Sequence, residues 1–191
     1  MDIFSQTFSA AEVAAACNIA PETLQNWMKR DLIMGHVDGE TKVAGGGSRG
    51  VRRQFSWENL MDIATASAFV EIGFLPTDAF KIAHRFSMVS DSGGAVWDDD
   101  PEAENRRGPY RAPSFPHHQS EGQTYLCAWG ETRRVILSKD GSINPHALAK
   151  PSDRATGFAC VNMTELFIHV ATRADLGQHP FAILDQIYKA G

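Results

Sequence analysis

Amide and basic side chains gather in two stretches of the first third of the chain, residues 23–30 and 42–53. Asparagine and glutamine pair well with adenine edges, and arginine and lysine bind phosphate oxygens or guanine. The second stretch carries four positive charges, several glycines and no acidic residue. Both stretches therefore indicate contact with nucleic acid. The candidate DNA-binding residues are Thr23, Gln25, Asn26, Lys29, Arg30, Lys42, Arg49, Arg52 and Arg53.

Two short helices must position the first stretch. The sequence SAAE at residues 9–12 has the form of a capping box, which predicts a helix from residue 10. Pro21 suits the first position of a second helix, because an N–H at that position would have no partner within the helix. Two helices joined by a tight turn, the second with amide and basic groups outside, form a helix-turn-helix candidate. The side chains expected to face inward on the second helix are Leu24, Trp27 and Met28.

A glycine-containing basic segment, residues 34–53, follows this pair of helices. Its composition favours a long hairpin or loop over a helix. Glycine lets the backbone follow a phosphate chain closely, and arginine donates to phosphate oxygens or reaches into a narrow minor groove. The segment therefore has the properties of a wing. Ser56 is expected to cap a third helix that Gly73 ends, and Pro76 opens a fourth. The expected core-facing stripe of the third helix is Trp57, Leu60, Ile63, Ala64, Ala68 and Ile72.

The order of these motifs resembles a known family. The chain reads FSAAEV from residue 8, TLQNW from residue 23, RQFSWENL from residue 53 and IGF from residue 72. This pattern is similar to the DNA-binding domain of the MerR-type winged helix-turn-helix regulators, and the similarity extends over residues 1–86. The resemblance implies a winged helix-turn-helix fold that binds double-stranded DNA.

Four departures from the family pattern affect the expected mechanism. Gln25 and Asn26 stand where the family usually has Arg-Tyr, and Glu22 stands where a basic residue is common. The wing is also longer and richer in glycine. Where other members continue into a long dimerising helix, this chain has a segment dominated by Pro, Gly, Ser and acidic residues. The base preference and the usual mode of promoter activation therefore do not carry over.

The remaining sequence predicts a linker or irregular loop over residues 87–122 and a small α+β module over residues 123–191. Strand-like runs at 125–129 and 132–138 flank Gly130, a hairpin turn signal, and predict a small antiparallel sheet. Asn162 is a helix cap candidate, although the apolar run after it also fits a strand. Pro180 begins a last helix. The fold class is therefore mostly α with α+β character.

Several kinds of chemistry are not indicated. The net charge of -5 and the pI near 5.8 do not suit a general polyanion binder, so DNA contact must come from a local patch. The three cysteines fit buried apolar positions better than a disulfide framework or metal site. The sequence shows no catalytic set and no cofactor motif. The histidine pair 117–118 has no further ligands nearby and is expected to be solvated. Aromatic residues at 97, 110, 125 and 129 fit a core better than an effector pocket.

These observations predict a sequence-specific transcription regulator, without a membrane segment and located in the cytoplasm. A domain of this size reads few base pairs, so a homodimer is expected. The C-terminal module is the candidate dimerisation or effector-sensing unit, with a small molecule or a protein as effector. Two alternatives remain. One is a phage-type excisionase, architectural or DNA-packaging protein, and the other is a protein-interaction adaptor whose winged domain has lost DNA binding.

Overall fold

The computed structural model describes residues 3–33, 53–90, 95–97, 109–143 and 157–189 of the chain. These residues form a mixed α+β fold with six α-helices and two small sheets. The helices are η1 (Ile3–Ser5, a 3-10 turn), α1 (Ala10–Ala16), α2 (Pro21–Lys29), α3 (Trp57–Glu71), α4 (Pro76–Ser87), α6 (Met163–Arg173) and α7 (Pro180–Lys189). The strands are β1 (Phe8–Ser9), β2 (Gln54–Phe55), β3 (Ala95–Trp97), β4 (Gln123–Trp129), β5 (Thr132–Ser138) and β6 (Ala159–Asn162).

The predicted starts of α1 and α3 are confirmed, and both are capping boxes. Ser9 accepts from the Glu12 backbone N–H while the Glu12 carboxylate accepts from the Ser9 N–H at 2.7 Å. Ser56 and Asn59 form the same reciprocal pair at the start of α3. Strands β1 and β2 pair antiparallel, with Ser9 opposite Gln54. This short ladder therefore joins the starts of α1 and α3, and it ties the chain after residue 52 to the start of α1.

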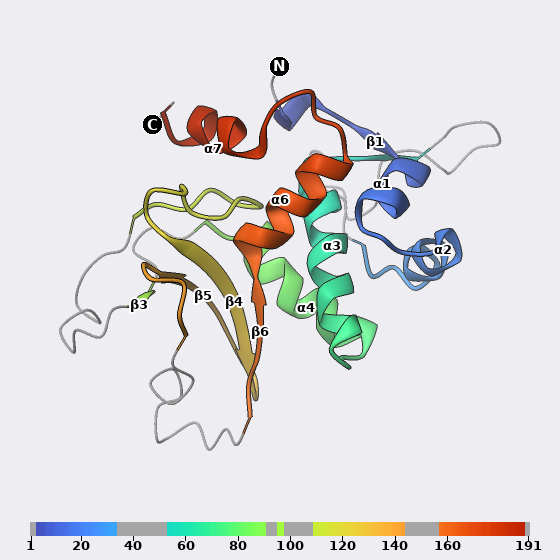
Figure 1. Ribbon diagram of the computed structural model, residues 1–191. Coiled ribbons are helices and arrows are strands. Elements are labelled where there is room, and N and C mark those ends of the chain that lie inside the picture. The colour runs from blue at the N-terminus through green and yellow to red at the C-terminus, as the bar shows by residue number, and fades with distance from the viewer. Residues whose placement is uncertain (1–2, 34–52, 91–94, 98–108, 144–156, 190–191) are drawn as a thin grey trace.

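Helix α3 lies at the centre of the fold, between α1, α4 and α6 (Figure 1). Eleven of its fifteen residues are buried. The predicted stripe is correct at Trp57, Leu60 and Ile63 but wrong at Ile72, which is 54% exposed. More residues of α3 are buried than the apolar pattern predicted, because polar side chains of this helix are buried as well. Thr65, for example, satisfies its hydroxyl by donating to the Met61 carbonyl at 2.7 Å.

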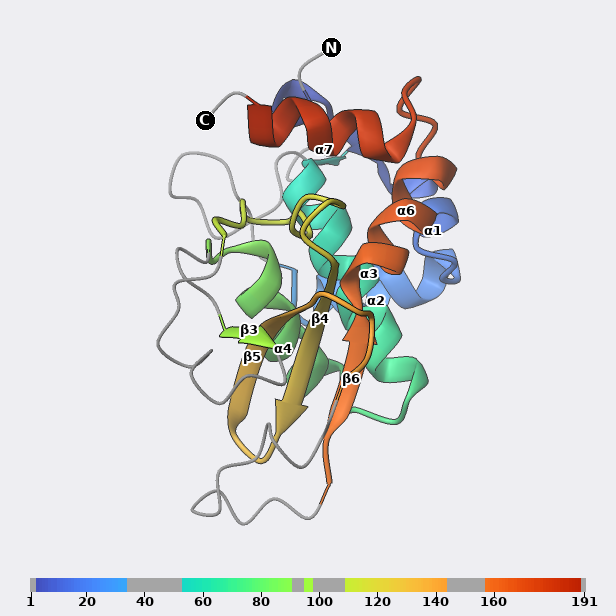
Figure 2. The same cartoon turned by 60° about the vertical axis from the view of Figure 1, so that its left-hand side comes forward.

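The four-stranded sheet has the order β3-β5-β4-β6. The predicted hairpin is confirmed: β4 and β5 are antiparallel, and Trp129 and Thr132 pair beside the turn. The edge strands β3 and β6 were not predicted, and β3 runs parallel to β5. Asn162 caps α6, so the run after it is a helix and the strand alternative is wrong. Helices α3, α4 and α6 cover one face of the sheet (Figure 2).

The irregular segment 109–122 is packed into the molecule. Arg111 and Phe115 are fully buried, and His117 is 2% exposed. The expectation of a solvated histidine pair is therefore wrong. The backbone N–H of His117 donates to Thr124 Oγ1 at 2.8 Å and its ring nitrogen lies 2.9 Å from the same oxygen, which offsets the cost of burial. His118 is half-buried and contacts Asp185 of α7 at 2.8 Å.

One hydrophobic core joins the N-terminal and C-terminal parts of the chain. At its centre, Trp57 stacks on Phe115 with the ring centroids 5.8 Å apart and meets Phe167 of α6 edge-on at the same distance. Arg173 of α6 also donates to the Ala15 carbonyl of α1 at 3.3 Å. The predicted domain boundaries at residues 86 and 122 stay a prediction. The N-terminal and C-terminal parts nevertheless share this core, so the stability of each depends on the other.

A buried polar cluster between α3 and α4 makes stability depend on pH. Asp62 is fully buried, accepts from Ser87 Oγ at 2.6 Å and lies 3.0 Å from His84 Nε2. Burial lowers the pKa of His84, but the hydrogen bond to Asp62 and the Asp62 charge raise it more, so the net shift is upward.

We therefore expect the free energy of unfolding contributed by this pair to be complete below the unfolded pKa of about 6.5 and lost as pH rises through the folded value. Between these values the folded state binds the extra proton, so stability falls with rising pH. Urea unfolding of wild type and His84→Gln from mildly acidic to alkaline pH checks this. The variant should show a flatter profile, and parallel profiles would contradict the assignment.

Candidate nucleic-acid interface

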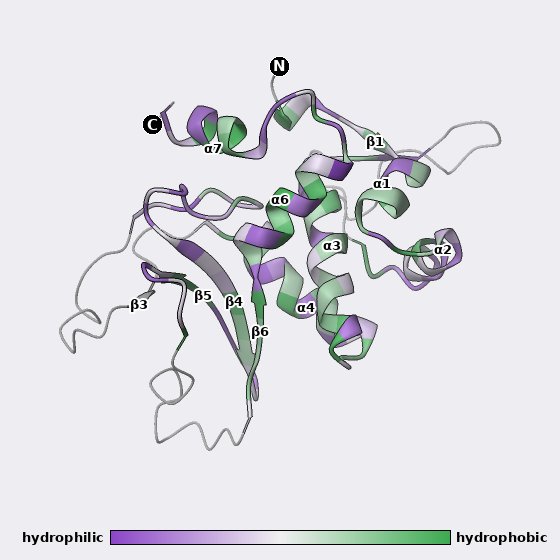
Figure 3. Cartoon of the chain, viewed as in Figure 1, coloured by the Kyte–Doolittle hydropathy of each residue, from purple (hydrophilic) through white to green (hydrophobic). Residues whose placement is uncertain are grey.

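Helix α2 has one buried side and one exposed side. Gln25, Asn26 and Lys29 are exposed, as is Glu22, and at this spacing the four lie on one face. Thr23 is half-buried at the border of that face. Figure 3 shows both hydrophilic and hydrophobic residues around α2, as one exposed and one buried side require. The structure thus places the predicted amide and basic groups of this helix together in solvent.

The buried side of α2 fixes the direction of its exposed face. Leu24 and Trp27 are buried, and Trp27 meets Phe80 of α4 edge-on with the ring centroids 5.2 Å apart. Helix α1 precedes it through a turn in which Asn18 has a φ of 54°. This conformation suits asparagine better than most side chains. Helix α2 is therefore held between α1 and α4, and it lies away from the four-stranded sheet (Figure 1).

Arg30 has a contact that the sequence did not reveal. Its guanidinium donates to Thr77 Oγ1, near the start of α4, at 3.2 Å. A guanidinium carries five N–H donors, so this bond leaves donors for another acceptor. The contact fixes where Arg30 lies relative to α2. The two residues are 47 positions apart, which is why no local pattern indicated the pair.

The predicted wing is described only at its two ends. The chain leaves the described region after Ile33, which is buried, and returns at Arg53, which is half-buried and directly precedes β2. Phe55 of β2 is fully buried, so the returning end is anchored in the core. The other three predicted basic contacts, Lys42, Arg49 and Arg52, lie outside the described residues.

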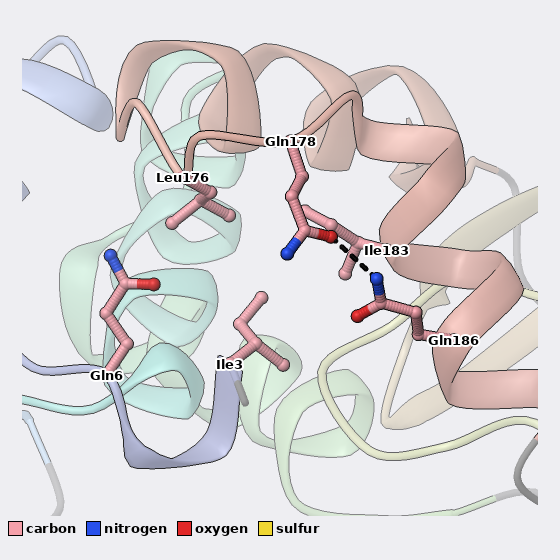
Figure 4. Close-up of a pocket in the computed structure, with 6 residues that line it drawn as sticks. All are labelled: Ile3, Gln6, Leu176, Gln178, Ile183 and Gln186. Atoms are coloured by element: carbon pink, nitrogen blue, oxygen red, sulfur yellow. Dashed lines mark hydrogen bonds between the residues drawn. The ribbon is translucent and has the colours of Figure 1, made fainter. Parts of the chain in front are cut away.

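A small pocket lies between η1, the α6–α7 connection and α7 (Figure 4). It contains about 230 Å³ of empty space, part of it open solvent, and Gln186 donates to Gln178 across its rim at 2.8 Å. The enclosed part is only about 10 Å³, room for about one water molecule, whereas pockets for small ligands usually reach 300–1,000 Å³. No charged or nucleophilic side chain lines this pocket. Its lining residues are Ile3, Gln6, Leu176, Gln178, Ile183 and Gln186.

Of the aromatic residues considered for an effector pocket, Tyr110, Tyr125 and Trp129 do not line this pocket. Tyr110 is 55% exposed, so the expectation of a core position is wrong for this residue. Trp129 is 3% exposed within a small apolar cluster, as expected of core, and Tyr125 donates to the Gly141 carbonyl. Among the residues that the structure describes, no three His, Cys, Asp or Glu side chains form a metal-ligand group. Within the same residues no helix has both the length and the apolar character needed to cross a membrane.

No family model and no curated protein matches the chain. The resemblance to MerR-type regulators therefore rests on the motifs quoted above and stays a prediction. What the structure adds to those motifs is geometric: two capped helix starts joined by a short ladder, and a second helix whose polar side faces solvent.

Proposed function

We propose that the protein is a sequence-specific regulator of transcription that binds double-stranded DNA through a winged helix-turn-helix of the MerR type. The observation that carries this proposal is the exposed amide-and-basic face of α2, formed by Gln25, Asn26 and Lys29 and backed by buried Leu24 and Trp27. A helix with this division presents its polar side to the major groove while its apolar side remains in the protein.

Each group on α2 has a distinct role in the proposal. Gln25 and Asn26 read adenine edges, because an amide can donate and accept at the same base. Lys29 and Arg30 bind phosphate or guanine, and Thr23 adds a phosphate contact. The wing arginines contact the phosphate backbone of the flanking DNA or its minor groove, and they supply most of the salt-dependent affinity. Two copies of the protein bind a symmetric site, since one copy reads only a few base pairs.

The first test of this proposal separates specificity from affinity. Replacing Gln25 or Asn26 by alanine should cost about 1–3 kcal/mol at the preferred site for each lost bidentate contact, with little change on unrelated DNA. Competition binding between the two DNAs measures the difference. Gln123→Ala, which lies on β4, is the control. An unchanged preference in both α2 variants would remove α2 from the reading of bases.

Glu22 supplies a second prediction, of opposite sign. It is exposed on the same face as Lys29, so its carboxylate faces the phosphates in the proposed complex. Glu22→Gln should tighten binding to all duplexes by about 2- to 5-fold at low salt, and the gain should shrink as salt screens the repulsion. Fluorescence anisotropy across a salt series measures both. Glu131→Gln, an equal charge change in the β4–β5 turn, should have little effect. Weaker binding by Glu22→Gln would show that this face does not approach DNA.

The same residue favours the adaptor as the second candidate function. A carboxylate on the exposed face of α2 and a net charge of -5 both oppose a polyanion. If neither the wild type nor Glu22→Gln binds any duplex at low salt, the result favours the adaptor, with the exposed polar face of α2 as its candidate protein-binding surface.

A further inference from the structure

Two of the three free cysteines lie opposite each other on neighbouring strands. Cys127 of β4 and Cys160 of β6 are Cα partners in an antiparallel pair. Directly opposed residues in such a pair have Cα atoms about 4.5–5.5 Å apart, which lies within the range of about 4.4–6.8 Å seen in disulfides. Opposed residues also project from the same face of the sheet. The register alone therefore places the two backbones at the separation that a disulfide between these residues requires.

The surroundings of the pair distinguish its two members. Cys127 is fully buried in the apolar cluster that contains Trp129 and Ile136, whereas Cys160 is half-buried at the edge of that cluster and in the edge strand. The thiols share a side-chain hydrogen bond, and this bond together with burial raises the pKa of Cys127 far above its usual range. Cys127 is therefore a poor first nucleophile, and an oxidant meets Cys160 first.

We propose that Cys127 and Cys160 form a site of reversible oxidation, at which a hydroperoxide joins the two thiols in a cross-strand disulfide. The Cys160 sulfur attacks the outer peroxide oxygen, the O–O bond breaks, and an alcohol or water leaves. Cys160 is then a sulfenic acid. The Cys127 sulfur attacks the Cys160 sulfur, the S–S bond forms, and the sulfenic hydroxyl leaves as water with the Cys127 proton. Two thiols lose two electrons and one hydroperoxide gains them.

The disulfide closes the segment between β4 and β6 and stabilises the folded state. It constrains the unfolded chain over the residues between positions 127 and 160, so the midpoint of thermal unfolding should rise by roughly 10 °C. Since Cys160 is only partly exposed, its reaction with the peroxide should be slow compared with that of an exposed low-pKa thiol. The third cysteine, Cys17, is the C-cap residue of α1 and is buried. Its thiol donates to the Leu60 carbonyl, and it does not take part in the proposed disulfide.

The test treats the reduced full chain with hydrogen peroxide and then counts free thiols after denaturation. The count should fall from three to one, the mass should drop by about 2 Da, and digestion should yield one peptide pair linked through Cys127 and Cys160. A dithiol reductant should restore all three thiols and reverse the thermal shift. Cys17→Ala should still form the bond, and Cys160→Ser should not.

Three results would overturn the proposal. They are unchanged thiols after prolonged treatment at peroxide concentrations that oxidise free cysteine completely much sooner, a mass gain from oxygen added to separate cysteines, and a disulfide that joins two copies of the chain. The peptide map of the wild type decides among these outcomes without relying on any variant to fold.

Discussion

Arg111→Met is expected to lower the free energy of unfolding by about 3–5 kcal/mol, a large part of the stability of an ordinary domain. Arg111 is fully buried, and its Nη1 donates to the carbonyls of Phe86, Ala112 and Phe115 at 2.9–3.1 Å. Its second terminal nitrogen donates to the Val89 carbonyl. Methionine has a similar apolar length but leaves these buried acceptors without the donor.

The position of Arg111 explains why one residue has so large an effect. It closes the C-terminal end of α4, where a positive charge complements the helix dipole, and its guanidinium lies 4.6 Å from the centre of the Phe86 ring. Urea unfolding followed by tryptophan fluorescence measures the loss. Arg173→Met removes an exposed arginine with one long bond and should cost less than about 1 kcal/mol. Equal losses in the two variants would contradict the assigned role, and Arg111→Lys provides a milder variant should methionine prevent folding.

The second large effect is expected at Trp57, where alanine should cost about 3–5 kcal/mol. The Trp57 side chain is fully buried between Phe115 and Phe167, so its removal leaves a cavity where three segments of the chain meet. Because those segments come from the N-terminal, middle and C-terminal parts of the sequence, thermal unfolding of the variant should stay a single transition with a lower midpoint. A first transition confined to one part of the protein would show that the core is not shared.

Trp57→Phe is the matched control for this cavity. The indole Nε1 of Trp57 is buried and has no hydrogen-bond partner among the residues that the structure describes. Phenylalanine keeps an aromatic ring against Phe115 and Phe167 and removes that N–H, so we expect a loss of only about 1–2 kcal/mol. A loss as large as that of alanine would mean that the N–H has an acceptor.

The parts of the fold that the sequence predicted are those set by neighbouring residues. The capping box at Ser9, the cap at Ser56, the helix starts at Pro21, Pro76 and Pro180, and the turn at Gly130 each depend on a few adjacent side chains. The exposed face of α2 was predictable for the same reason, because helical spacing alone separates it from the buried side.

The features that were missed depend on distant partners. Strand β3 exists only because it pairs with β5, some forty positions further along the chain. Burial of Arg111 requires the end of α4, and burial of His117 requires Thr124 of β4. In a Pro- and Ser-rich segment these residues look solvated. Local composition indicates only the average environment of a segment and does not show which distant residues pack against it. The Arg30–Thr77 contact is the corresponding case in the candidate site.

The most direct test of the proposed function is selection of bound fragments from a genomic DNA library at about physiological salt. The wild type is compared with Arg52→Ala/Arg53→Ala, which should weaken binding to every duplex and flatten the salt dependence by about two ion equivalents. We predict that the wild type enriches one motif with two symmetric half-sites and that the variant loses this enrichment. No enrichment by the wild type, together with no binding to any duplex at low salt, would contradict the proposal.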